Sequence, residues 1–239
     1  MSSIKTEARK AGALYLLLGI TAPFNQIYVP SAFIVSGDAA ATARNITAGE
    51  LTYRLGVFTG LISNIAFLFV ALSLYNLLKD VDRKQARLMV VLAAVGATVG
   101  IVTLLTQIAP LAFLSGADFL SAFSRPQLEA LSLAFLRLRG SGNHLAMAFW
   151  ALWLYPFGLL VLKSRLFPRV LGILLILGCF AYLVLSFTGI VFPQQRQVVS
   201  QVALPFYAVG EVAMILWLLI KGAKVSEPEP GAPGMLPAR

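Results

Sequence analysis

One acidic residue, Glu211, stands inside a long apolar segment near the end of the sequence. Residues 197–220 contain no other charged side chain. If a helix covers about 198–220, Glu211 lies near the middle of a membrane, where an ionised carboxylate is costly and an acid is a functional candidate. The position therefore predicts either a neutral hydrogen-bond donor or a proton carrier.

Three further polar residues are expected at a similar depth. Counting along the apolar segments places Asn25, Asn64 and Tyr182 near the same level as Glu211. Together the four could form one polar layer that acts as a substrate or proton site. The alternative is a set of interhelical hydrogen bonds, each worth about 0.6 kcal/mol. A water-accessible cavity reaching the layer would favour the first interpretation, and a dry, closed core the second.

Two more polar residues are secondary candidates near the outer membrane surface. His144 begins the fourth apolar segment, and Gln107 lies in the outer half of the third. A histidine there is either an interfacial polar residue or one with a catalytic or sensing role. An enzyme that acts on a lipid or a quinone would gather its polar groups here, around His144 and residues 125–139.

Several kinds of chemistry lack the residues that they need. Cys179 and His144 are the single cysteine and the single histidine, so no cysteine- or histidine-based zinc site can be built. The sequence contains no phosphate-binding loop, nucleophile elbow or metalloprotease motif. We therefore expect neither a metal nor a cofactor, and whether the protein is an enzyme stays open, with a non-enzymatic role favoured.

The elements that position these residues follow from composition. Of 239 residues, 59% are hydrophobic and 12% are charged, and the mean hydropathy is +0.83. Such a chain is typical of a protein whose main solvent is the bilayer. We predict an all-α integral membrane protein with six transmembrane helices in a single bundle, covering residues 1–221, and a disordered cytoplasmic tail at 222–239. The predicted spans are 11–35, 54–78, 88–114, 143–162, 170–192 and 198–220.

Small residues and prolines indicate how these helices pack. The pairs Gly56/Gly60 and Gly96/Gly100 each create a small face that permits close helix approach, within the bundle or, as the alternative, in a dimer. Pro23 lies inside the first apolar segment, just before the polar pair at 25–26. This makes the first helix the best candidate for a functional break.

Two loop signatures predict helix starts. Residues 47–50 have the pattern of a capping box, which places the start of the second helix near Ala48. Residues 124–127 have a similar pattern before an amphipathic stretch over 125–139. We interpret that stretch as a helix on the outer interface, a lid that meets a partner, or a short helix packed on the ends of the bundle.

Basic residues are distributed unevenly between the two sides of the predicted bundle. The net charge is +9, and thirteen of the 19 Lys and Arg residues fall on the side of the two termini. This bias predicts a protein of the inner cell membrane with both termini in the cytoplasm. The bilayer is then the main partner and nucleic acid is not expected, while a small-molecule ligand and a homo-oligomer stay open.

Three short motifs carry a resemblance to a known family. They are Arg9-Lys10-Ala11-Gly12, the run 168–172 continued through Gly178 to Tyr182-Leu183, and Gly210-Glu211 followed by residues 216–222. With these motifs the chain resembles a prokaryotic family of multi-pass membrane proteins catalogued as domain-of-unknown-function family 4386. The resemblance implies the six-helix architecture and draws attention to Glu211, but it implies no activity.

Three classes of function therefore stay open. The first is a small-molecule or proton-linked binding or transport protein with a midplane polar site around Glu211. The second is a non-catalytic structural or sensory membrane protein, in which Glu211 serves packing alone. The third is the membrane-embedded enzyme described above, for which no pair of nucleophile and base is recognisable in the sequence.

Overall fold

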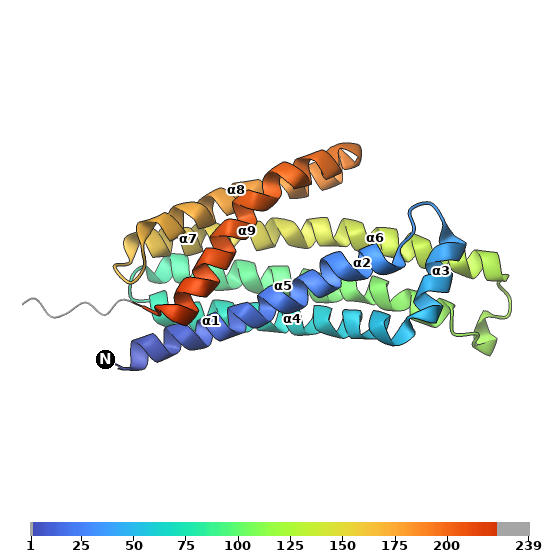
Figure 1. Cartoon of the computed structure of the whole chain (residues 1–239), viewed down its shortest axis with the longest axis horizontal. Helices are drawn as coiled ribbons and strands as arrows, with labels where there is room; N and C mark the ends of the chain where they lie inside the picture. Colours follow the sequence, from blue (N-terminus) through green and yellow to red (C-terminus); the bar gives the residue numbers. More distant parts are fainter. Residues whose placement is uncertain (1, 224–239) are drawn as a thin grey trace, which may run out of the picture.

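Helices make up nearly all of the computed structural model, which describes residues 2–223 (Figure 1). Within this range no strand is present, and six helical segments are long and apolar enough to cross a membrane. These six segments are Ile4–Phe33, Glu50–Leu78, Arg83–Phe113, Arg125–Lys163, Arg169–Val191 and Pro193–Ile220. The predicted fold class is confirmed. Nearly all of the tail predicted at 222–239 lies outside the described residues.

The described range contains nine α-helices, one π-helix and two 3₁₀ turns, most of which lie within the six segments. The α-helices are α1 (Ser2–Pro23), α2 (Val29–Phe33), α3 (Ala39–Ala48), α4 (Glu50–Leu78), α5 (Arg83–Phe113), α6 (Arg125–Leu152), α7 (Leu154–Lys163), α8 (Arg169–Val191) and α9 (Arg196–Ile220). The π-helix is η1 (Phe24–Tyr28), and the 3₁₀ turns are η2 (Asp118–Leu120) and η3 (Pro193–Gln195).

The long helices are arranged as a ring. Helix α1 packs against α4 and α9, α5 packs between α4 and α6, and α8 contacts α6, α7 and α9. The described ends of the chain lie at one end of the bundle, together with the α4–α5 and α7–α8 connections (Figure 1). We call this the terminal end and the opposite one the distal end. A buried apolar core that includes Tyr15, Trp153 and Leu218 joins the helices toward the terminal end.

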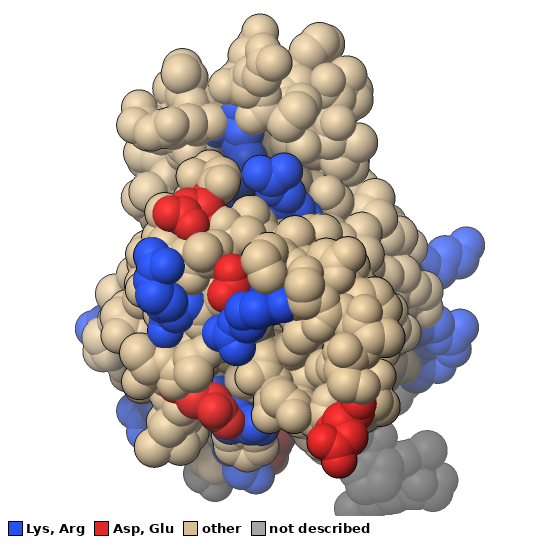
Figure 2. Space-filling view, turned by 90° about the vertical axis from the view of Figure 1, so that its right-hand side faces the viewer, with Lys and Arg blue, Asp and Glu red and all other residues tan. Residues whose placement is uncertain are grey.

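Three segments extend further than a bilayer requires. Helices α4 and α5 have 29 and 31 residues, and the segment α6–α7 has 39, against about 20 for one crossing. The tip of the α8–α9 hairpin stops short of the distal end that α3, α5 and α6 reach (Figure 1). Side chains of both charges gather on the distal face (Figure 2), and exposed ion pairs such as Arg54–Glu50 form there.

Two local predictions at the distal end are wrong. Residues 125–139 form no separate interfacial helix, because α6 runs unbroken from Arg125 to Leu152. The capping box at 47–50 is absent, since the Thr47 hydroxyl donates to the Ala43 carbonyl and the Glu50 carboxylate pairs with Arg54. Helix α4 instead begins at Glu50, directly after Gly49. At 124–127 the expected bond from the Ser124 amide to the Gln127 side chain is present at 2.8 Å.

The first membrane segment changes its helical form after Pro23, as the sequence predicts. Residues Phe24–Tyr28 form the π-helix η1 between α1 and α2. A proline removes one backbone hydrogen bond and crowds the preceding turn, and π-helical turns often mark functional positions. The break therefore places Asn25, which is buried, in a non-standard turn that faces the bundle interior.

Candidate functional site

Tyrosines from two other helices lie beside the Glu211 carboxyl, and one of them donates a hydrogen bond to it. The Tyr15 hydroxyl of α1 donates to Glu211 Oε2 at 2.6 Å, across 196 residues of sequence. Tyr182 of α8 lies beside the same carboxyl, and the Tyr182 ring stacks on Tyr207 with centroids 4.0 Å apart. We call these four residues, Glu211, Tyr15, Tyr182 and Tyr207, the carboxyl cluster.

Glycines let the three helices of the carboxyl cluster approach closely. A Cβ atom on Gly12 of α1 would lie 2.9 Å from the Leu218 Cβ and 3.0 Å from the Leu219 backbone nitrogen. On the other side of α9, a Cβ on Gly210 would lie 2.9 Å from the carbonyl oxygen of Leu174 in α8. Backbone is in near contact at both crossings, and this brings Tyr15 and Tyr182 within reach of Glu211.

No positive charge offsets the Glu211 carboxyl within the described part of the chain. The four ion pairs found there lie elsewhere. Tyr15 is 1% exposed, whereas Glu211 is only partly buried. A carboxyl with a tyrosine donor and no cation partner has the features needed to gain and lose a proton.

A second polar cluster surrounds Arg139 of α6. Its Nε atom donates to Gln107 Oε1 at 2.7 Å, and its Nη2 atom donates to Asn25 Oδ1 at 2.7 Å and to the Asn25 carbonyl at 3.1 Å. Asn25 Nδ2 donates to Gln107 Oε1 at 2.9 Å, and the Tyr53 hydroxyl donates to the Gln107 carbonyl at 2.7 Å. We call Asn25, Tyr53, Gln107 and Arg139 the guanidinium cluster.

The π-helix and the glycines of α4 position the guanidinium cluster. Asn25 Nδ2 donates to the Gly56 carbonyl at 2.6 Å. A Cβ on Gly60 would lie 2.8 Å from the Asn25 side chain, so the glycine leaves the room that Asn25 occupies. A small apolar group that includes Phe33, Tyr53 and Leu136 packs beside this cluster. Four separate helical segments, η1, α4, α5 and α6, therefore meet at one buried guanidinium.

The four residues expected in one polar layer lie in different surroundings. Tyr182 accompanies Glu211, whereas the Asn25 side chain bonds to Gly56, Gln107 and Arg139. Asn64 donates to the Gly60 carbonyl of its own helix and abuts Gly100 of α5. Among the other glycines of the two pairs, Gly56 faces Val29 and Gly96 faces Trp150.

The two secondary candidates, Gln107 and His144, also lie in different surroundings. Gln107 is 1% exposed and bridges Asn25 to Arg139. His144 is buried against Gly189, and its backbone carbonyl accepts a hydrogen bond from the Ser186 hydroxyl at 2.6 Å. The His144 Nδ1 atom bonds to no described residue. The described residues contain no group of histidine, cysteine and acidic side chains that could hold a metal ion.

Sequence reasoning missed Tyr15, Tyr53 and Arg139. Arg139 had a usable signal, because it continues the stripe of buried α6 positions Leu128, Ser132 and Leu136 at helical spacing. No sequence signal indicated Tyr15, since its hydrogen-bond partner Glu211 is 196 residues away. Tyr53 lies next to the charged residue Arg54 at the start of α4, where it resembles an interfacial aromatic residue.

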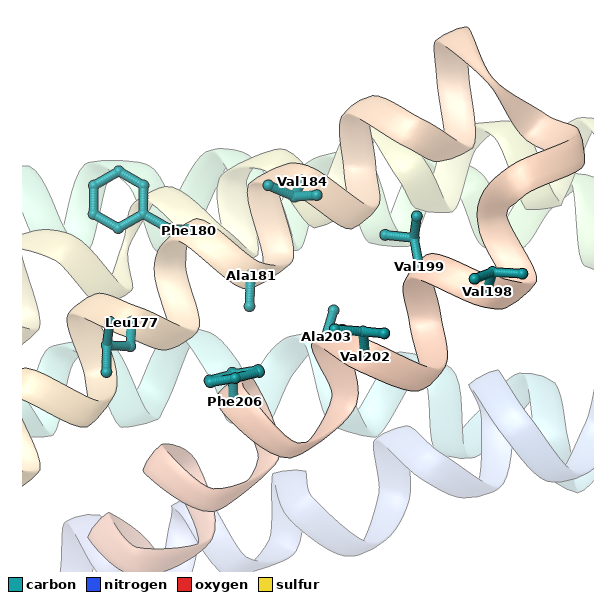
Figure 3. A pocket seen from close by; sticks show the side chains of 9 residues that line it. All are labelled: Leu177, Phe180, Ala181, Val184, Val198, Val199, Val202, Ala203 and Phe206. Carbon is teal, nitrogen blue, oxygen red and sulfur yellow. The ribbon is translucent and has the colours of Figure 1, made fainter.

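An apolar groove lies between α8 and α9, with a volume of about 450 Å³ (Figure 3). The residues that line it are Leu177, Phe180, Ala181, Val184, Val198, Val199, Val202, Ala203 and Phe206. No polar side chain points into it. On a membrane-spanning surface such a groove is suited to lipid chains, and it supplies no group for chemistry.

The fold and the two clusters define a multi-pass membrane protein with a carboxyl and a guanidinium inside one six-helix bundle. Residues 10–222 match the family model described as Domain of unknown function (DUF4386), and the chain belongs to that family. The resemblance seen in the sequence motifs is confirmed. No curated protein and no solved structure matches the chain.

Proposed function

We propose that the protein binds a small molecule within the membrane and transports it, coupled to a proton carried by Glu211. The observation that carries the proposal is the hydrogen bond from Tyr15 to a partly buried carboxyl without a cation partner among the described residues. A carboxyl kept only for packing gains little, because one such bond in a membrane bundle contributes about 0.6 kcal/mol.

Two features of the first membrane segment support the proposal that this segment moves during transport. The π-helix η1 follows Pro23, and broken helices are common at transporter sites. The same segment carries Tyr15 of the carboxyl cluster and Asn25 of the guanidinium cluster. A shift of this one segment would therefore affect both clusters at once.

The experiment uses purified protein in liposomes that contain a pH-sensitive dye. Small organic acids, amines, amino acids and sugars are added outside in turn. We expect at least one class to change the internal pH with the wild-type protein. The change should be abolished by Glu211→Gln, which keeps a hydrogen-bonding group of the same size but has no ionisable proton. Thermal stability should stay close to that of the wild type.

Glu50→Gln is the matched control, because Glu50 is an exposed acid in a surface ion pair. It should transport like the wild type. The proposal fails if no class changes the internal pH, or if Glu211→Gln supports the same change as the wild type.

We also propose that the protein resides in the cell membrane with its terminal end in the cytoplasm. The support is the excess of Lys and Arg in the connections at that end, thirteen of 19 by sequence position. A reporter fused after Ile220 should then act as cytoplasmic, and one inserted between Ser121 and Ser124 should act as external. The opposite pattern would reverse the proposed orientation.

A further inference from the structure

The guanidinium of Arg139 is a buried charge without an acidic partner in the described residues. Arg139 is 5% exposed and belongs to none of the four ion pairs of the described residues, whereas Glu50 pairs with Arg54 and Glu129 pairs with Arg125. Amide and carbonyl oxygens alone surround the guanidinium. Because a buried charge normally pairs with its opposite, this arrangement leaves a positive site for an anion.

The hydrogen-bond inventory of the cluster points in the same direction. Both side-chain amide oxygens are used: Asn25 Oδ1 accepts from Arg139, and Gln107 Oε1 accepts from Arg139 and from Asn25. Two nitrogens are left over, since Arg139 Nη1 and the buried Gln107 Nε2 donate to no described residue. Both of these nitrogens are N–H donors, so a ligand that binds to them must supply hydrogen-bond acceptors.

The hydrogen bonds of the Gln107 side-chain amide fix its orientation, so the fold itself leaves the Nε2 donor without a partner among the described residues. Turning its amide by 180° would place an N–H group against the donors of both Arg139 and Asn25. The bonds at 2.7 and 2.9 Å therefore fix the oxygen toward these two residues and Nε2 away from them.

We infer that Arg139, with Gln107, binds an oxyanion, either a carboxylate or a phosphate, as the charged part of the transported molecule. Oxyanions present several acceptor oxygens and form short, strong hydrogen bonds with guanidinium. The inference rests on the proposed function for the transport step, whereas binding itself stands apart from it. A monovalent anion at Arg139 together with one proton on Glu211 would cross the membrane without net charge.

The neighbours of Arg139 on its own helix include a small residue and a polar one. A Cβ on the next residue, Gly140, would meet no atom within 4 Å, and Asn143, one turn further along, is only half-buried. On the distal face, Lys or Arg side chains are visible in the recess below the apolar upper part of the molecule (Figure 2). Positive charge there would attract anions toward this end of the bundle.

The test measures binding to the purified full-length protein in an uncharged detergent, by calorimetry in chloride buffer at constant ionic strength. The probes are sodium acetate, inorganic phosphate and decanoate. Acetate or phosphate binding identifies a free oxyanion as the ligand, while binding of decanoate alone identifies the head group of an amphiphile. Either result supports the inference if Arg139→Gln weakens binding at least about tenfold.

Arg137→Gln is the matched control, because Arg137 lies two residues away on the same helix and is exposed. It should bind like the wild type. If Arg139→Gln does not purify as a folded protein, Arg139→Lys serves as the test variant. It keeps the positive charge but lacks the planar guanidinium group with its paired N–H donors, and it should weaken binding several-fold.

The inference is overturned if none of the probes binds at about 10 mM, where even a ligand of millimolar affinity saturates its site. It is equally overturned if Arg139→Gln and Arg139→Lys bind as tightly as the wild type, or if Arg137→Gln weakens binding as much as they do. Binding that depends on Arg139 while Glu211→Gln leaves transport unchanged would refute the proton-linked function and keep the oxyanion site.

Discussion

Replacing Asn25 by leucine is expected to lower the free energy of unfolding by about 2 kcal/mol. The substitution removes three side-chain hydrogen bonds between helical segments, to Gly56, Gln107 and Arg139. At about 0.6 kcal/mol for each bond, the loss is close to 2 kcal/mol. It also removes one of the oxygens that surround the buried Arg139 charge, which adds to the cost.

The measurement is unfolding by sodium dodecyl sulfate in mixed micelles, followed by circular dichroism. Asn76→Leu is the control, because Asn76 is an exposed residue of α4 toward its terminal end. It should change the free energy by less than about 0.5 kcal/mol. Equal effects of the two substitutions would mean that the guanidinium cluster does not stabilise the bundle.

Gly12→Ala is expected to destabilise the protein by about 1–3 kcal/mol and to part Tyr15 from Glu211. The added methyl group would lie 2.9 Å from the Leu218 Cβ and 3.0 Å from the Leu219 nitrogen. Two of the three nearest atoms are backbone, so a rotamer change cannot relieve the contact and α1 must move away from α9. The hydrogen bond between Tyr15 and Glu211, at 2.6 Å, spans this crossing.

Gly140→Ala is the matched control for this substitution. A Cβ at Gly140 meets no atom within 4 Å, and alanine favours the helix by about 0.5–1 kcal/mol relative to glycine. We expect stability unchanged or slightly raised, measured by the same detergent titration. If Gly12→Ala is as stable as Gly140→Ala, the result would contradict the close approach of α1 and α9.

The membrane-spanning architecture could be predicted because hydropathy acts over each segment separately. Six long apolar runs require six spans, whatever their neighbours are. The course of α6 could not be predicted in this way. Its first half carries Arg125, Glu129, Arg137 and Arg139, which suggest a polar surface segment, yet packing against α3 and α5 keeps the helix unbroken. Tertiary contacts there outweigh the local pattern.

The candidate site could be predicted only in part, because sequence depth shows the level of a residue but not the direction of its side chain. Glu211 was identifiable because a carboxylate in an apolar membrane helix costs free energy, and Asn25 was identifiable from the proline before it. Their partners Tyr15 and Arg139 depend on which faces of distant helices meet. Those faces are set by glycine contacts such as Gly12 against Leu218, which arise only in the folded bundle.

The most direct test of the central claim, that Glu211 carries a proton within the membrane, is labelling by dicyclohexylcarbodiimide. This apolar reagent modifies protonated carboxyl groups in membranes, and mass spectrometry of peptides locates the label. We predict modification of Glu211 in the reconstituted wild-type protein, strong at mildly acidic pH and lost at alkaline pH, and no label at position 211 in Glu211→Gln. An unlabelled Glu211 across the whole pH range, alongside labelling of other acids, would contradict the account.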